Sequence, residues 1–177
     1  MSQEQPGRYR RSAGGLVAAM AVLVAVVLLG AAARSLVSRE PNTPTPRVDY
    51  ASVVPAARKA ADFSLLAPRR LPAGWRATTV GYRDEPQPHW HLGVLTDRNR
   101  YVGLEQGNVP VRQMVHRYVD EAATRGRPVD VAGAPWATYT DSGGDLGLVR
   151  RHGRTTTLVV GHDVPESALV SYAASLR

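Results

Sequence analysis

Two histidines separated by one residue are the first feature of this 177-residue sequence that could do chemistry. His89 and His91 flank Trp90, and residues two apart on a β-strand point to the same face, so both rings could bind one metal ion. No third ligand follows at a recognisable spacing. The pair comes directly after a proline-containing loop, where exposed polar residues are normal. We therefore expect no metal site and no cofactor.

Three pairs of carboxylates could in principle work as a general acid and a general base. They are Asp84 with Glu85, Asp120 with Glu121, and Asp141 with Asp145. All lie in expected loops or turns or on the polar side of an expected helix, where contact with water explains them. The short motifs of serine hydrolases, phosphate-binding loops and zinc proteases are absent from the sequence. We predict no catalytic residue and a non-enzymatic protein.

Four arginines at two expected hairpin tips are the candidate binding residues: Arg98, Arg100, Arg151 and Arg154. Asn99 and Gly153 suit the left-handed position of a tight turn, so arginine there can simply keep the turn soluble. The alternative is contact with a lipid headgroup, an acidic polymer or another envelope protein. Each basic residue near an anionic surface contributes about 1 kcal/mol. Both interpretations are open at this point.

Composition excludes several classes of protein. The chain has no cysteine, which excludes disulfides, thiolate metal sites, a cysteine nucleophile and a lipid-modified N-terminal cysteine. The net charge of +7 and the pI of about 10.4 are compatible with nucleic-acid binding. The basic residues are scattered, however, aromatic residues make up only 6%, and no nucleic-acid-binding motif is present. We expect no nucleic-acid partner.

An uncharged segment near the N-terminus predicts a transmembrane helix. Residues 12–33 form a run of 22 residues without a charge, and residues 16–29 are apolar on every side of a helix. At a rise of about 1.5 Å per residue, roughly 20 residues cross the hydrocarbon core of a bilayer. The small residues 31–33 keep a cleaved signal peptide as an alternative, although the apolar segment is longer than the core of such peptides.

Basic residues on the two sides of this segment predict its orientation. Arg8, Arg10 and Arg11 precede it, whereas Arg34 and Arg39 follow it, which favours a cytoplasmic N-terminus and a domain outside the plasma membrane. Three prolines within residues 41–46 then predict an extended tether. The expected organisation is a cytoplasmic tail at 1–11, a transmembrane helix at 12–34, a Pro-rich tether at 35–49 and an extracytoplasmic α+β domain at 50–177.

The extracytoplasmic domain shows an internal similarity at an offset of 54 residues, which pairs residues 92–95 with 146–149 and Leu104 with Leu158. Each half reads as strand, strand, strand and helix. The pattern predicts an antiparallel sheet of about six strands, two pseudo-repeats and helices on one face. One buried sheet face should hold Leu92, Val94, Val102, Leu104, Leu146, Leu148 and Leu158, and the core should include Trp75, Trp90 and Trp136.

Helix boundaries are predicted from caps and periodicity. Ser52 with Pro55 predicts a helix start before an apolar run that ends ahead of Pro68. The spacing of apolar residues predicts a second helix over 111–122. Asn108 and Asp163, each followed by a proline two residues later, are the expected caps of the two repeat helices.

Several short segments resemble the DUF4245 family of actinobacterial membrane proteins. They are an N-terminal apolar segment with a Pro-rich tether, residues 71–76 (LPAGWR), residues 133–136 (GAPW), residues 159–161 (VVG) and residues 173–176 (AASL). The resemblance extends from about residue 10 to the end of the chain. It implies a location and a lineage, and no activity, cofactor or catalytic residue.

The combined expectation is a non-enzymatic, single-pass plasma-membrane protein whose outer domain engages a cell-envelope component. Its bilayer contact would be the anchor. The alternative is a module that binds a small ligand or a lipid in a pocket between the sheet and the helices. The sequence leaves the partner and the oligomeric state open.

The anchor prediction can be checked by mass spectrometry of the protein purified from membranes. An uncleaved helix predicts that peptides from residues 1–11 remain part of the mature chain, because the membrane segment stays attached. A mature chain that begins at Arg34 or Ser35 would contradict the anchor and support signal-peptide cleavage.

Overall fold

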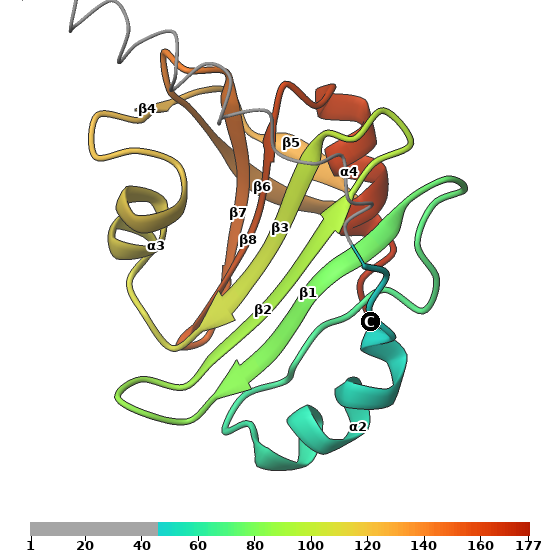
Figure 1. The fold of residues 1–177 in the computed structure, drawn as a ribbon. Helices are drawn as coiled ribbons and strands as arrows, with labels where there is room; N and C mark the ends of the chain where they lie inside the picture. Colours follow the sequence, from blue (N-terminus) through green and yellow to red (C-terminus); the bar gives the residue numbers. More distant parts are fainter. Residues whose placement is uncertain (1–45) are drawn as a thin grey trace, which may run out of the picture. The chain divides into compact units, whose positions relative to one another are not determined.

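The computed structural model describes residues 46–177, which fall within one compact unit. Three helices and eight strands follow one another in this part of the chain (Figure 1). In chain order they are α2 (Tyr50–Ala60), β1 (Arg76–Arg83), β2 (His89–Leu95), β3 (Tyr101–Gly107), α3 (Val111–Tyr118), β4 (Thr124–Arg125), β5 (Val129–Val131), β6 (Ala134–Thr140), β7 (Asp145–His152), β8 (Thr155–His162) and α4 (Glu166–Ala174).

The sheet consists of two three-stranded meanders that meet in its middle. The strand order is β1-β2-β3-β8-β7-β6-β4, all neighbours are antiparallel, and the short β5 pairs with β6. The central pair is β3 with β8, in which Leu104 lies opposite Val159. The predicted α+β class with an antiparallel sheet is confirmed, and β4 and β5 add to the six expected strands.

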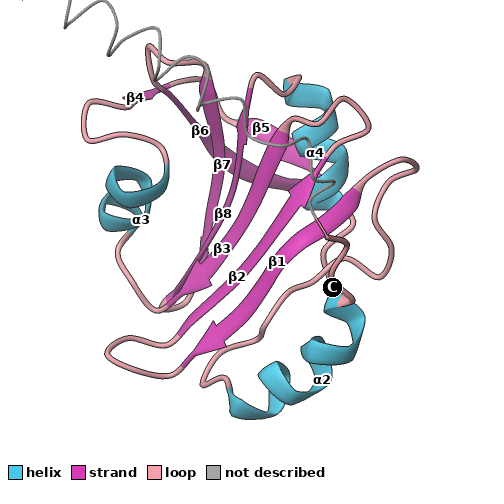
Figure 2. Cartoon of the chain, viewed as in Figure 1, coloured by secondary structure: helices cyan, strands magenta, loops and turns pink. Residues whose placement is uncertain are grey.

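The main core lies on the face of the sheet that α2 and α4 cover, which we call the α4 face (Figure 2). It contains Trp75, Trp90 and Trp136, which are 7%, 0% and 4% exposed, as predicted. Tyr172 of α4 stacks on Trp75 with 5.6 Å between ring centroids. The side chain of Gln106 fastens the segment after α2 to this face, because its amide bonds both the Leu66 N–H and the Ser64 carbonyl.

A second, smaller core lies on the opposite face, which we call the α3 face. Met114 and Val115 of α3 pack there against Val149 of β7 and against Leu158 and Val160 of β8. The prediction of helices on one face is therefore wrong. The two halves of the sheet repeat their strand order, but α3 and α4 lie on opposite faces (Figure 1).

The same difference corrects the predicted apolar face. Leu158 was expected to share a face with Leu104, but the residue opposite Leu104 is Val159. Because neighbouring residues of a strand point to opposite faces, Leu158 belongs to the α3 face. The offset of 54 residues therefore relates β2 to β7 correctly, but between β3 and β8 it is wrong by an odd number of residues. A shift by an odd number moves each side chain of a strand to the other face of the sheet.

The helix ends also differ from the prediction, because side chains form other bonds. The N-terminal cap of α2 is Asp49, which accepts the Ala51 N–H, so Pro55 lies inside this helix and not in its first turn. Helix α3 ends at Tyr118 because Asp120 accepts the Ala122 N–H in a local turn. Asn108 and Asp163 cap neither repeat helix: Asn108 bonds Asp62 and Thr155, and Asp163 pairs with Arg100.

The expected tail, transmembrane helix and most of the tether lie outside the described residues. Within residues 46–177, no helix combines the length and the apolar character needed to cross a bilayer.

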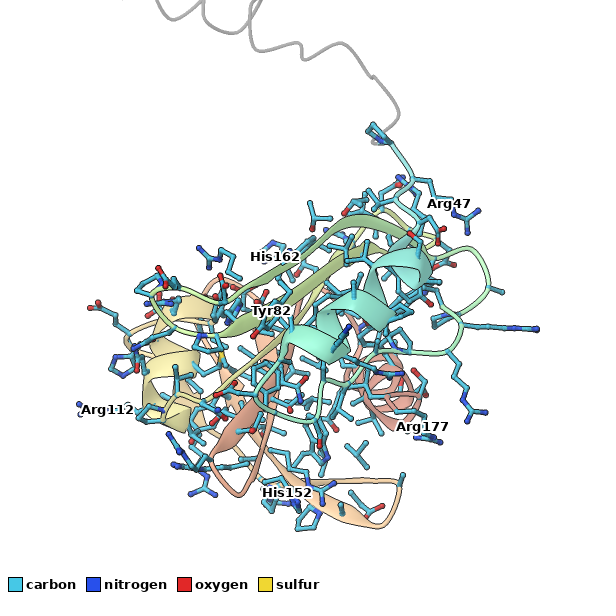
Figure 3. All side chains as sticks on the ribbon, turned by 90° about the horizontal axis from the view of Figure 1, so that it is seen from below. Arg47, Tyr82, Arg112, His152, His162 and Arg177 are labelled. Atoms are coloured by element: carbon cyan, nitrogen blue, oxygen red, sulfur yellow. The ribbon has the colours of Figure 1, made fainter. Side chains whose placement is uncertain are left out.

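Substitutions on α3 test its packing on the second core. Met114 is 1% exposed, so Met114→Ala should lower the free energy of unfolding of the full chain by about 2–5 kcal/mol. Arg112 on the same helix points away from the sheet (Figure 3), and Arg112→Ala should change it by less than about 0.5 kcal/mol. Denaturant unfolding followed by circular dichroism measures both. Equal small effects would contradict the packing of α3 on this face.

Candidate functional site

A buried carboxylate on the α3 face holds two histidines. Glu105 of β3 is 2% exposed, and its Oε2 lies 2.7 Å from Nε2 of His89 while its Oε1 lies 2.6 Å from Nδ1 of His91. Both histidines come from β2, which pairs with β3 so that His91 lies directly opposite Glu105. The predicted common face of His89 and His91 is confirmed. On this face both histidines are bonded to the same carboxylate, that of Glu105.

The carboxylate determines where the ring protons lie. A deprotonated carboxylate only accepts hydrogen bonds, so His89 must donate from Nε2 and His91 must donate from Nδ1. A neutral His91 then keeps an unprotonated Nε2, which lies 2.8 Å from the hydroxyl oxygen of Thr79 in β1. The cluster therefore joins three neighbouring strands through one chain of hydrogen bonds.

Tyr118 at the end of α3 completes the cluster. Its ring stacks on His89 with 5.5 Å between centroids and 10° between planes, and its hydroxyl oxygen lies 3.0 Å from Nε2 of His89. Because that nitrogen already carries a proton, the Tyr118 hydrogen must point elsewhere. Burial and the Glu105 charge raise the pKa of Tyr118, while Arg117 and Arg83 act in the opposite direction. Tyr118 therefore remains a hydrogen-bond donor at neutral pH.

Two glycines on this face differ in the space beside them. A Cβ on Gly93 would lie 2.3 Å from Oγ1 of Thr79 and 3.0 Å from the hydroxyl of Tyr101, and one on Gly81 would meet no atom within 4 Å. A pocket of about 440 Å³ lies beside Gly81, which we call the glycine pocket. Its lining includes Gly81, Arg83, His89, His91, Tyr101, Glu105, Tyr118 and Val160.

A second pocket of about 440 Å³, the α3 pocket, lies between the β1–β2 loop and α3. It is lined by Arg83, residues 86–89, Val109, Gln113, Met114, Arg117 and Tyr118. Arg83 comes from the end of β1 and Arg117 from the last turn of α3, and neither forms an ion pair among residues 46–177. Arg83, His89 and Tyr118 border both pockets, so the buried cluster connects them.

The geometry argues against a metal ion between the histidines. Both rings approach Glu105 at direct hydrogen-bond distance, which leaves no space for an ion between them. Among residues 46–177, no group of three or more His, Cys, Asp or Glu side chains has the arrangement of a metal site.

The four predicted arginines do not form one surface. Because β3 and β8 are antiparallel, the β2–β3 tip with Arg98 and Arg100 and the β7–β8 tip with Arg151 and Arg154 lie at opposite ends of the sheet (Figure 2). Asn99 and Gly153 do take left-handed backbone, both with φ of 58°. Arg100 pairs with Asp163 at 3.0 Å. Contact of these arginines with an anionic surface stays a prediction for each tip separately.

Sequence reasoning missed the residue at the centre of the site. Glu105 is the one charged residue of β3, where it lies between Leu104 and Gln106, and no motif links it to His89 or His91. The available signal was its place: Glu105 is the carboxylate at the end of the expected strand 101–105, and that strand follows a His-x-His strand. Antiparallel pairing of consecutive strands brings such positions together. None of the three carboxylate pairs, Asp84 with Glu85, Asp120 with Glu121 and Asp141 with Asp145, belongs to the cluster.

The described domain is thus an α+β protein with a buried two-histidine carboxylate cluster between two pockets. The chain belongs to the DUF4245 family, whose model, described as a protein of unknown function, matches residues 8–176. The predicted family is confirmed. A comparison with curated proteins found no match.

The Glu105 cluster can be tested through stability. In Glu105→Gln the new NH₂ group faces one of the two ring N–H groups, so one buried donor loses its acceptor, and we expect a loss of about 3 kcal/mol in the free energy of unfolding. The control is Asp163→Asn, which removes an exposed pair and should cost less than about 1 kcal/mol. Denaturant unfolding of both full-length variants measures the difference. Similar losses would contradict a central role for Glu105.

Proposed function

We propose that this protein is a membrane-anchored binding module whose α3 pocket takes a small anionic ligand. The observation that carries the proposal is the convergence of Arg83, Arg117 and Tyr118, from a strand and a helix, on one hollow of about 440 Å³. Ligand pockets of proteins typically have volumes of about 300–1,000 Å³. The sequence left open a module with a ligand pocket between the sheet and the helices; the pocket proposed here lies between the β1–β2 loop and α3.

The charge of the pocket supports an anionic ligand. Glu105 is turned away from the α3 pocket by its bonds to His89 and His91. The donors in its lining include the two guanidinium groups, the Tyr118 hydroxyl and the amides of Gln87 and Gln113. Guanidinium groups bind carboxylates and phosphates with two parallel hydrogen bonds. A small carboxylate or phosphate compound is therefore the class of ligand that fits.

The anchor belongs to the same proposal. Residues 12–34 would cross the plasma membrane with the N-terminus inside, and residues 35–49 would hold the domain outside it. A binding module in that position meets small molecules of the envelope space.

Contact with an envelope component is a second candidate, centred on one end of the domain. The chain enters the sheet there, since the Val48 N–H bonds the Ala77 carbonyl. Arg47, Arg69 and Arg70 border one hollow at this end, and Arg98 borders a neighbouring hollow that shares Trp75 with the first. These arginines are next to the tether, whereas Arg151 and Arg154 lie at the far end. An acidic polymer or lipid headgroup would be the partner.

Inorganic phosphate is a simple probe of the α3 pocket. At ten times its dissociation constant, phosphate should stabilise the full chain by about 1.4 kcal/mol and raise its melting temperature by about 5 °C relative to sodium chloride of equal ionic strength. Arg83→Gln and Arg117→Gln should each remove most of this shift.

The matched control is Arg112→Gln, on the same helix but outside the pocket, which should keep the shift. Differential scanning calorimetry measures all four proteins. A shift that is absent in the parent, or equally large in the Arg83 and Arg117 variants, would contradict an anion site in the α3 pocket.

A further inference from the structure

Thr79, His91 and Glu105 form a hydroxyl–imidazole–carboxylate chain on the α3 face. The Thr79 hydroxyl oxygen lies 2.8 Å from Nε2 of His91, and Nδ1 of the same ring lies 2.6 Å from Oε1 of Glu105. Glu105 is buried, whereas Thr79 is exposed. This is the order of contacts in which a hydroxyl becomes a nucleophile: an accessible oxygen, a base beside it, and a buried acid that orients the base.

An irregularity in β1 places Thr79 beside His91. The pairing of β1 with β2 shifts between Ala77 and Thr79, so Thr78 is an extra residue there. In a regular strand Thr79 would share the face of Ala77, which is buried in the α4 core. The bulge turns Thr79 to the α3 face instead. Bulges of this kind re-aim side chains and are frequent near active sites.

The residue opposite Thr79 is a glycine, and the hydroxyl uses the space that this leaves. Oγ1 of Thr79 lies 2.3 Å from the point that a Cβ of Gly93 would occupy, and the Tyr101 hydroxyl lies 3.0 Å from the same point. An alanine at position 93 would therefore displace the Thr79 hydroxyl from its place beside His91.

The position of the ring proton of His91 allows this side chain to act as a base. Glu105 accepts from Nδ1 of His91, which leaves the lone pair of Nε2 directed at the Thr79 hydroxyl. The Tyr101 hydroxyl is a further donor, close to the position that a Cβ of Gly93 would occupy. Burial, the Glu105 charge and Tyr118 raise the pKa of Tyr101 to about 12, so its hydroxyl keeps its proton at neutral pH. A donor at this place can stabilise negative charge that develops on a carbonyl oxygen.

We infer that Thr79 is a nucleophile for acyl transfer from carboxylic esters, with His91 as its general base and Glu105 as the residue that positions His91. In the first step Oγ1 of Thr79 bonds to the ester carbonyl carbon and its proton passes to Nε2 of His91. The ester C–O bond then breaks, and the leaving alcohol takes that proton. Water then gives a proton to Nε2 of His91 while its oxygen bonds to the acyl carbon. The bond between that carbon and Oγ1 of Thr79 breaks, the carboxylic acid leaves, and His91 returns the proton to Oγ1.

This activity goes beyond ligand binding and differs from the non-enzymatic role expected from the sequence. The three residues come from three strands and from no contiguous motif, so a search for short motifs does not reveal them. The inference does not depend on an anion in the α3 pocket, because Arg117 takes no part in it.

Acetylation by p-nitrophenyl acetate tests the nucleophile. The full-length chain is incubated with the ester, and peptide mass spectrometry locates the acetyl group. We expect acetylation at Thr79, lost in Thr79→Val, retained in Thr79→Ser and reduced about 100-fold or more in His91→Gln, in line with the contribution of a general base. Gly93→Ala should also remove it, because the variant keeps the hydroxyl but displaces it.

The matched control is Thr78→Val, the neighbouring threonine, which should leave the acetylation of Thr79 unchanged. Unfolding curves of each variant show whether it is folded under the labelling conditions. Acetylation of Thr79 no faster than that of Thr78, or equally fast in His91→Gln, would overturn the inference.

The role of Glu105 is tested on the ring of His91 itself. Nitrogen NMR of histidine-labelled protein distinguishes the two neutral tautomers, and we expect the proton of His91 on Nδ1. In Glu105→Asp the acceptor is kept, so the tautomer and part of the Thr79 acetylation should remain, whereas Glu105→Gln should shift the tautomer mixture and lower the acetylation. A proton on Nε2 of His91 in the parent protein would overturn the arrangement.

Discussion

The buried carboxylate of Glu105 is the constraint around which the α3 face is arranged. An ionised carboxylate that is removed from water is costly unless its oxygens accept hydrogen bonds, and here two histidine rings of the neighbouring strand supply them. These bonds fix both rings and both sets of ring protons. Through His89 they reach Tyr118 at the end of α3, and through His91 they reach Thr79 at the edge of the sheet.

The two faces of the sheet differ because two of the three helices in residues 46–177 pack on one face and one packs on the other. Helices α2 and α4 cover one face with the main core, whereas on the other face α3 packs its apolar side chains on β7 and β8 and reaches β2 through Tyr118. On that other face, glycines stand where β1, β2 and β3 would otherwise carry larger side chains. The glycine pocket lies beside one of them, Gly81, and the end of α3 forms one wall of the neighbouring α3 pocket.

Glu105 links the two proposed activities without making either depend on the other. Its Oε2 holds the histidine that borders the α3 pocket, and its Oε1 holds the histidine beside Thr79. Arg83 and Arg117 line the α3 pocket, whereas His91, the base beside Thr79, lines the glycine pocket. The histidine at the proposed anion site, His89, and the histidine at the proposed acyl-transfer site, His91, are separated by one residue of β2.

The sequence by itself determined the strand and helix types, the antiparallel class and the burial of Trp75, Trp90 and Trp136, because these follow from local periodicity and from the cost of exposing large apolar side chains. It also placed His89 and His91 on one face. Tertiary structure decided which face each helix covers, since one residue of register between β3 and β8 exchanges the faces. It also decided the site, because the bulge at Thr78 and the pairing of β2 with β3 bring Thr79, His91 and Glu105 together, and such contacts depend on pairing between strands and not on neighbours in the chain.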